Sequence, residues 1–239
     1  MEVRLDILRR ANADDQPHWQ SFDVSYDDEN LTVALALTQL NERDDLRDAA
    51  GNPAEPIRWQ CSCLQKKCGS CAMVIEGLPR LACDTKLSDF RSGTIRLEPL
   101  RKFPVVADLI VDRSAMRQNL TDINAWLEGP ARMDQVSTMD AYDASRCLQC
   151  GCCLDVCPNF YFGGTFTGPA STTVASRLVS IAPEQQEKRM FAEYRTHVYD
   201  GCGKSLACSS ICPAEIEMDK LLVRSNAAAV WRRRKTRHR

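Results

Sequence analysis

The chain has 239 residues, a formal net charge of −1 at pH 7 and only 7% aromatic residues, so no charge field favours nucleic acid as a partner. Its most apolar run, LTVALAL at 31–37, is far shorter than the ~20 residues that span a bilayer. The amino-terminal segment MEVRLDILRR lacks the pattern of a secretory signal, and we therefore expect a cytoplasmic protein.

The first half of the chain predicts a small α+β domain. Segments 2–8 and 20–26 alternate polar and apolar residues and predict two strands joined by a loop. Residues 31–46 follow a capping region and predict a helix. A loop rich in Gly and Pro leads to a first group of cysteines, and 94–100 predicts a closing strand. We place this domain at residues 1–104.

The second half predicts a helical domain at residues 105–231. Apolar residues recur at helical spacing from 106 to 127, with the aliphatic stem of Arg113 counted on that face, and Gly129-Pro130 ends the pattern. Four later segments are also helix-like and are separated by Gly/Pro loops: TMDAYDASRCLQC, ASTTVASRLVSI, QEKRMFAEYRTHVYD and MDKLLVRSNAAAVW. The basic tail RRRKTRHR at 232–239 is either a solvated charge run or a contact for anionic lipid or an acidic partner.

The 13 cysteines are the most informative residues of the chain. A reducing compartment disfavours disulfides, and an odd number excludes complete internal pairing. They fall into three tight groups, at 61–83, 147–157 and 202–212. Buried cysteines that act only as small hydrophobes would be scattered. The grouping therefore predicts ligation of a soft metal.

The first group has the spacing C-x4-C-x2-C-x11-C, which is typical of plant-type [2Fe–2S] ferredoxins, at Cys63, Cys68, Cys71 and Cys83. Gly69 allows the loop to fold tightly, so that amide N–H groups point at sulfur. A zinc site is the alternative, but such sites pair two C-x2-C turns and only one is present. Cys61 is a second candidate for the first ligand. The x4 spacing favours Cys63 and leaves Cys61 as a free thiol.

The second group follows the bacterial ferredoxin run C-x2-C-x2-C-x3-C-P, at Cys147, Cys150, Cys153 and Cys157-Pro158. In proteins with two clusters, the fourth cysteine of such a run ligates the other cluster. Three of these cysteines are therefore expected to bind one cluster, and Cys157 a second. Cys152 fits no register and is expected to be a packing residue.

The third group, Cys202-x5-Cys208-x3-Cys212-Pro213, is the same run with Ser205 in place of its middle cysteine. The exchange of the fourth cysteine predicts a [4Fe–4S] cluster on Cys147, Cys150, Cys153 and Cys212. The remaining three thiolates predict a [3Fe–4S] cluster on Cys157, Cys202 and Cys208. The alternative is a [4Fe–4S] cluster whose fourth iron binds Ser205 or water.

With these motifs the chain resembles the iron–sulfur subunit of the succinate dehydrogenase and fumarate reductase family. Further matching segments occur in the same order: RWQC…CGSC…LACDTKL, FPVVADLIVDRSAM and FTGPA. The resemblance implies a β-grasp ferredoxin-like domain followed by an α-helical ferredoxin domain. It also implies a flavoprotein partner with covalent FAD and the dicarboxylate site, and a membrane anchor with a quinone site. The complex would lie on the cytoplasmic face of a bacterial inner membrane.

In this family, electrons pass one at a time through the three clusters between flavin and quinone, in the tricarboxylic acid cycle or in anaerobic respiration. The resemblance places three residues of this chain in the quinone pocket: Pro158, Asn159 and Phe162. Several members have a histidine where this chain has Gly203, and many have a lysine where it offers Arg224 and Asn226. The resemblance therefore leaves ubiquinone, menaquinone and a soluble carrier open as the acceptor.

No residue is expected to act as an acid–base catalyst, because the only histidines are His18, His197 and His238 and no dinucleotide fingerprint is present. Two other functions compete. One is the iron–sulfur subunit of another flavin oxidoreductase, such as glycolate oxidase or anaerobic glycerol-3-phosphate dehydrogenase; Ser205 and the 63–83 motif argue against it. The other is a zinc-stabilised interaction module without a redox role.

Overall fold

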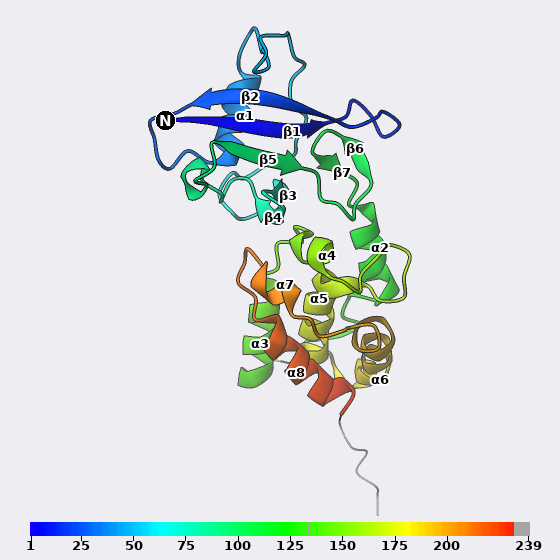
Figure 1. Cartoon of the computed structure of the whole chain (residues 1–239). Coiled ribbons are helices and arrows are strands. Elements are labelled where there is room, and N and C mark those ends of the chain that lie inside the picture. Colours follow the sequence, from blue (N-terminus) through cyan, green and yellow to red (C-terminus); the bar gives the residue numbers. More distant parts are fainter. Residues whose placement is uncertain (133, 232–239) are drawn as a thin grey trace, which may run out of the picture. The chain divides into compact units, whose positions relative to one another are not determined.

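The computed structural model describes residues 1–132 and 134–231, and the chain forms two compact units (Figure 1). The first unit contains Met1–Arg113 together with Leu148–Asp155. The second contains Ser114–Cys147 and the chain from Val156 onward. The basic tail predicted at 232–239 lies outside the described residues. Within those residues, no helix is both long enough and apolar enough to cross a membrane.

The first unit is built on a five-stranded mixed sheet with the order β2-β1-β5-β3-β4. β1 pairs antiparallel with β2 and parallel with β5, while β3 is antiparallel to both β4 and β5. Alternating residues of β1 are buried, as the sequence pattern predicts. The bounds are β1 (Glu2–Arg9), β2 (His18–Ser25), β3 (Ala72–Ile75), β4 (Leu78–Leu81) and β5 (Thr94–Glu98).

Helix α1 (Val33–Asn41) buries one face against the first unit and ends earlier than the predicted 31–46. Thr32 caps its first turn by accepting a hydrogen bond from the N–H of Leu35 at 3.3 Å. At the other end, the Asn41 amide exchanges two 2.8 Å hydrogen bonds with the backbone of Ile57. These bonds anchor the segment that leads into the first cysteine group.

The hairpin β3–β4 was not predicted from the sequence, because all four residues of β3 are buried and show no alternation of polar and apolar residues. Glu76 and Gly77 both have positive φ, 48° and 78°, as a two-residue hairpin turn requires. Pro79 lies on β4, an edge strand, where its missing N–H costs no ladder bond. The hairpin carries Cys71 and Cys83 at its two ends.

The helix predicted over 106–127 is wrong in its first part. Residues Val105–Ala107 and Ile110–Val111 form the short strands β6 and β7, and helix α2 covers only Ser114–Asp122. The predicted domain boundary at residue 104 falls inside the first unit, which continues to Arg113. A short η1 turn, Leu87–Asp89, also belongs to this unit.

Asp108 is the physical reason why the chain reverses between β6 and β7 instead of continuing as a helix. Its side chain is only 2% exposed, and its φ of 41° reverses the chain between β6 and β7. The carboxylate accepts hydrogen bonds from Arg9 Nε at 3.0 Å, from the Arg10 N–H at 2.8 Å and from the Arg58 N–H at 2.9 Å. A buried carboxylate needs such partners, and they outweigh the helical periodicity of the local sequence.

The second unit is helical, as predicted, and α5 is its central element (Figure 1). Helix α5 is buried along most of its length and packs against α2, α3, α6 and α8. A core cluster includes Ile123, Tyr194 and Leu222 from three of the surrounding segments. The bounds are α3 (Gln135–Ser145), α4 (Cys152–Val156), α5 (Gly168–Ile181), α6 (Glu184–Tyr194), the π-helical η2 (Arg195–Tyr199), α7 (Ala207–Ser210) and α8 (Met218–Ala229).

Candidate iron–sulfur sites

The loop that begins at Cys63 directs backbone N–H groups toward sulfur. The amides of Gln65 and Lys67 donate to Cys63 Sγ at 3.4 and 3.3 Å, and the amide of Lys66 donates to Cys83 Sγ at 3.3 Å. Leu64 and Lys66 have positive φ, 53° and 57°, which turns successive N–H groups to one side. Such bonds stabilise negative charge on sulfur, as cluster ligation requires.

The four thiols predicted to bind the [2Fe–2S] cluster interact with one another. A hydrogen bond from the Ser70 side chain, aided by Cys63, lowers the pKa of the Cys68 thiol to about 6. Burial raises the pKa of Cys71 to about 12, and the charges of Cys83 and Cys68 act in the same direction. The loop thus brings Cys63, Cys68, Cys71 and Cys83 together, although the assignment of these residues as ligands stays a prediction.

Cys61 differs from Cys63 in its surroundings. Cys61 is exposed, whereas Cys63 is half-buried and accepts two amide N–H groups. Within the described residues, no N–H donates to the sulfur of Cys61. The geometry therefore favours Cys63 as the first ligand, in agreement with the x4 spacing.

Within the described residues, no three Cys, His, Asp or Glu side chains are placed to hold a single metal ion. One zinc ion would need its sulfurs at about 2.3 Å from a common point. A two-iron cluster would divide the four thiolates between two metals, whereas a zinc ion would hold all of them.

Cys150 and Cys152 lie in the first unit and have different roles in the structure. The thiol of Cys152 donates to Cys150, which lowers the pKa of Cys150 to about 7 and raises that of Cys152 well above its usual value. Cys152 is fully buried, at 0% exposure, at the start of α4. The burial of Cys152 suits the packing role predicted for it, and the assignment of Cys150 as a ligand stays a prediction.

Gly69 brings the first cysteine loop against Cys150. Its φ is +75°, and a Cβ at this position would lie 2.7 Å from Cys150 Cβ and 2.8 Å from the Leu148 carbonyl oxygen. Both distances are shorter than real Cβ contacts, so only glycine fits without a backbone shift. The glycine predicted to shape the loop thus also allows a close backbone contact with a cysteine of the second group.

Arg113 is a site residue that sequence reasoning missed. It was counted as an apolar stem on a helix, but it lies before α2 and its guanidinium group binds the first cysteine loop. Its Nη1 donates to the Ser70 carbonyl and to Gln60 Oε1, and its Nη2 donates to the Ala72 carbonyl, each at 3.2 Å. The only hint in the sequence is that a charged residue interrupts an otherwise apolar stripe.

Two of the predicted [4Fe–4S] ligands, Cys147 and Cys212, lie in the second unit. In the second unit, Cys147 and Cys212 pack on one hydrophobic cluster that contains Ala144, Ile216, Met218 and Leu221. Arg146 donates to the Ala214 carbonyl at 2.7 Å, which fixes the end of α3 to the segment after Cys212. Two of the four predicted ligands thus share one local environment.

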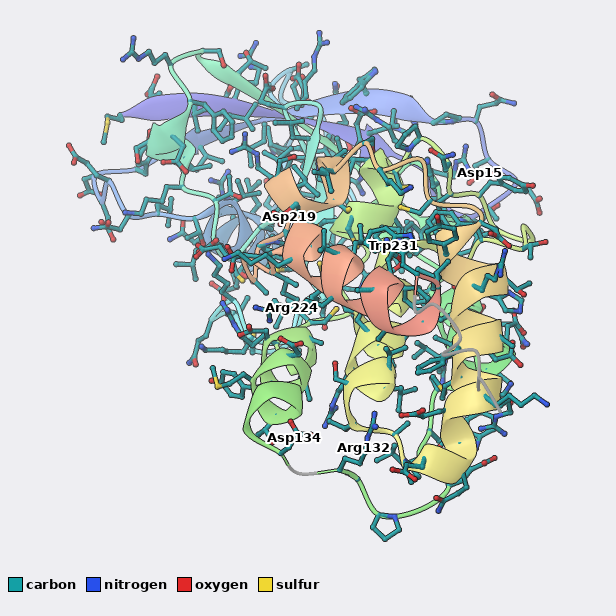
Figure 2. All side chains as sticks on the ribbon, turned by 90° about the horizontal axis from the view of Figure 1, so that it is seen from below. Asp15, Arg132, Asp134, Asp219, Arg224 and Trp231 are labelled. Atoms are coloured by element: carbon teal, nitrogen blue, oxygen red, sulfur yellow. The ribbon has the colours of Figure 1, made fainter. Side chains whose placement is uncertain are left out.

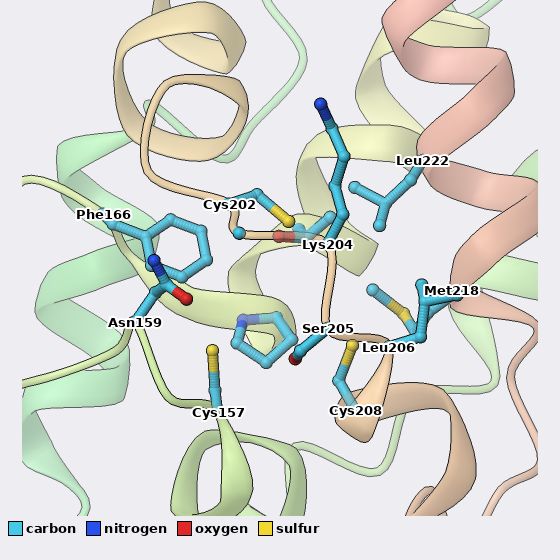
Figure 3. Close-up of a pocket in the computed structure, with 13 residues that line it drawn as sticks. Cys157, Asn159, Phe166, Cys202, Lys204, Ser205, Leu206, Cys208, Met218 and Leu222 are labelled. Atoms are coloured by element: carbon cyan, nitrogen blue, oxygen red, sulfur yellow. The ribbon is translucent and has the colours of Figure 1, made fainter.

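The three cysteines predicted to bind the [3Fe–4S] cluster line one pocket of the second unit, with an empty volume of about 350 Å³. Figure 3 shows the sulfur atoms of Cys157, Cys202 and Cys208 directed into it, and Ser205 also lines it. Burial raises the pKa of Cys208 to about 11, and the charges of the other two thiolates add to this effect. Apolar side chains complete the walls: Phe166, Pro169, Leu206, Met218 and Leu222.

Gly203 and Asn159 both line this pocket, and Figure 3 shows the Asn159 side chain there. A Cβ at residue 203 would lie 2.5 Å from Asn159 Oδ1, so a histidine does not fit here unless Asn159 moves. Three residues were matched to the quinone pocket. Asn159 lines this cavity, whereas Pro158 is exposed. Phe162 packs edge-on against Phe160, with 4.9 Å between the ring centroids. Several family members have a histidine at the position of Gly203, and in this chain the glycine leaves room for the Asn159 side chain.

Arg224 and Asn226 on α8 both have structural partners. Arg224 forms an ion pair with Asp140 of α3, and Figure 2 shows it on the side of α8 that faces α3. Asn226 is buried and accepts a 2.9 Å hydrogen bond from the Tyr194 hydroxyl. These two side chains therefore hold the helices of the second unit together.

Comparisons with known proteins agree with this architecture. Residues 4–118 match the family model of a 2Fe-2S iron-sulfur cluster binding domain, and residues 143–216 match that of a 4Fe-4S dicluster domain. The succinate dehydrogenase iron-sulfur subunit of Bacillus subtilis is 36% identical, covering 90% of this chain and 88% of the relative. The chain belongs to the family of succinate dehydrogenase and fumarate reductase iron–sulfur subunits.

Other relatives support the same family. The fumarate reductase iron-sulfur subunit of Haemophilus influenzae is 31% identical, again covering 90% of this chain and 88% of the relative. A chain of the Mycobacterium smegmatis Sdh1 complex in the apo form shares the fold, with a TM-score of 0.74 and 22% identity over 95% of this chain and 96% of that one. The predicted family and α+β fold class, and the presence of 2Fe-2S and 4Fe-4S domains, are thereby confirmed.

The two candidate first ligands give a test of the loop geometry. Cys61→Ser should leave the EPR signal of the reduced [2Fe–2S] cluster unchanged, because Cys61 is exposed and receives no N–H group from the described residues. Cys63→Ser should abolish or alter the signal, because serine replaces a thiolate that the loop amides stabilise. The reverse pattern would show that the loop accommodates the x6 spacing and that Cys61 is the ligand.

Proposed function

We propose that this chain is the electron-transfer subunit of a succinate dehydrogenase or fumarate reductase complex. It would pass electrons one at a time between a flavoprotein subunit and a membrane quinone. One observation carries the proposal. In this member of the family, a loop lined by amide N–H groups brings the cysteines of the plant-type motif together, and three other cysteines line a pocket of the second unit. Iron–sulfur clusters, when bound, accept and release single electrons, which divides a two-electron flavin reaction into two steps.

The chain's own residues would hold the three clusters in distinct environments. Amide N–H groups and positive-φ residues support the thiolates predicted for [2Fe–2S]: Cys63, Cys68, Cys71 and Cys83. The ligands proposed for [4Fe–4S] are Cys147, Cys150, Cys153 and Cys212, and those for [3Fe–4S] are Cys157, Cys202 and Cys208. Hydrogen bonding and solvent exposure at each site would set its potential.

The proposed partners supply the chemistry that these residues do not. A flavoprotein subunit with FAD would bind the dicarboxylate, and a membrane anchor would bind the quinone close to Pro158, Asn159 and Phe162. The relatives named above are described as subunits, and this chain covers most of their length. The complex would then hold the chain at the cytoplasmic face of a bacterial inner membrane. Asn159 lines the same pocket as Cys157, Cys202 and Cys208, which supports a quinone site close to these three cysteines.

The partner can be tested on the isolated chain. Purified alone, the chain should show no turnover of succinate or fumarate with an artificial dye, although dithionite should still reduce its clusters. The tagged chain, purified from cells that produce it naturally, should bring a flavin-containing subunit and recover dicarboxylate turnover. Turnover by the isolated chain, or a complex without flavin, would contradict the proposal.

Ser205 decides the type of the third cluster. A serine hydroxyl must lose a proton of high pKa to bind iron. The pKa of a free cysteine thiol is only ~8.5, and bound iron lowers this pKa further. Ser205→Cys should therefore favour [4Fe–4S], lower the potential at this site and weaken the EPR signal of the air-oxidised [3Fe–4S] form.

Ser205→Ala is the matched control for this change. It removes the hydroxyl and should leave the [3Fe–4S] signal unchanged. Wild-type protein without that signal would favour the alternative, a [4Fe–4S] cluster with Ser205 or water on the fourth iron. If Ser205→Cys keeps the signal at full strength, the shape of the pocket, rather than the missing thiolate, excludes the fourth iron.

A further inference from the structure

Arg113 is a charged side chain that connects two cysteine groups within the first unit. Its guanidinium group donates to the carbonyls of Ser70 and Ala72, the residues on either side of Cys71. The same loop contacts Cys150 through Gly69, where there is no room for a Cβ. Arg113 is thus fixed to the loop of one predicted cluster at the place where that loop meets a ligand of the next.

The charge of Arg113 acts on the thiols of both groups. Burial lowers the pKa of Arg113, and the charges of nearby cysteines oppose this effect: Cys150, Cys152, Cys71 and Cys68. A guanidinium group nevertheless stays protonated in proteins. Among the described residues, its buried Nε has no hydrogen-bond partner.

We propose that Arg113 is a positioning residue whose fixed positive charge raises the reduction potentials of both the [2Fe–2S] and the [4Fe–4S] cluster. The inference rests on the proposed function, because it needs clusters on the cysteines of both groups. Reduction adds one negative charge to a cluster, and a nearby cation stabilises the reduced form more than the oxidised form. The electron passes from one of these clusters to the other. The positive charge therefore stabilises the reduced cluster both before and after the transfer.

Arginine suits this role better than a mobile cation. Three hydrogen bonds of 3.2 Å, to Gln60, Ser70 and Ala72, hold the planar guanidinium group in one place. The burial of the group limits solvent screening, so that its field reaches the neighbouring sulfurs with less attenuation. A surface cation of the same unit would have a weaker effect.

The test is an EPR-monitored redox titration of the holo-complex with Arg113→Gln. At the wild-type midpoint of each cluster, the ratio of reduced to oxidised form should fall about tenfold, which corresponds to about 59 mV for a one-electron couple. Arg4→Gln is the matched control, because it removes the same charge from an arginine of β1 that pairs with Asp23 of β2, two strands away from β3 in the sheet. The control should leave both midpoints close to wild type.

A shift of only one midpoint, or of neither, would overturn the proposal, and so would an equal shift in Arg4→Gln. If Arg113→Gln assembles no clusters, Gln60→Glu provides the test. Its carboxylate accepts the same Nη1 hydrogen bond and offsets the charge while Arg113 stays in place. Both midpoints should then fall, by less than tenfold in the ratio because residue 60 is exposed; unchanged midpoints would overturn the proposal.

Wild-type protein separates a failure of this inference from a failure of the proposed function. Wild-type complex without the [2Fe–2S] and [4Fe–4S] signals would contradict the cluster assignment itself. Wild-type complex with both signals, but with midpoints that do not depend on Arg113, would contradict only the role of this arginine.

Discussion

A cysteine that holds iron must carry a negative charge on its sulfur, although much of the side chain is shielded from water. The rest of this structure depends on meeting that requirement. Charge on sulfur in a poorly solvated site is costly unless hydrogen bonds or metal compensate it. The first unit supplies backbone N–H groups from Gln65, Lys66 and Lys67. In the pocket of the second unit, where burial raises the pKa of Cys208, bound iron would have to supply the compensation.

Hydrogen bonds far from the sulfurs fix the segments that carry them. Asp108 binds the backbone of Arg58, and Asn41 binds the backbone of Ile57, so the chain enters the first cysteine group from two anchored residues. At the far side, Gly69 leaves room for the backbone at Cys150. The side chain of Asp108 is almost fully buried with that of Arg9, so loss of either partner would leave an uncompensated charge. The positions of the cysteines therefore depend on packing elsewhere in the unit.

Sequence patterns predicted what depends on local spacing. The alternation of β1 and the helical segments around α5 follow from short-range periodicity, and the three cysteine groups follow from ligand spacing that chemistry fixes. The turn at Asp108 and the role of Arg113 were missed, because each depends on partners distant in the sequence. The hairpin β3–β4 pairs neighbouring residues and was missed for another reason, since β3 is buried on both faces and shows no alternation. Asp108 finds Arg9 and Arg58, and Arg113 finds the carbonyls of the first cysteine loop. A single sequence does not reveal such pairs.

The central claim is that one chain carries three clusters of different nuclearity. Mössbauer spectroscopy of anaerobically purified, ⁵⁷Fe-labelled protein tests it most directly, together with iron and zinc analysis. The account predicts about nine irons per chain, divided two, four and three among the components of the spectrum. Protein that contains zinc and no iron, or a spectrum without a two-iron component, would contradict it.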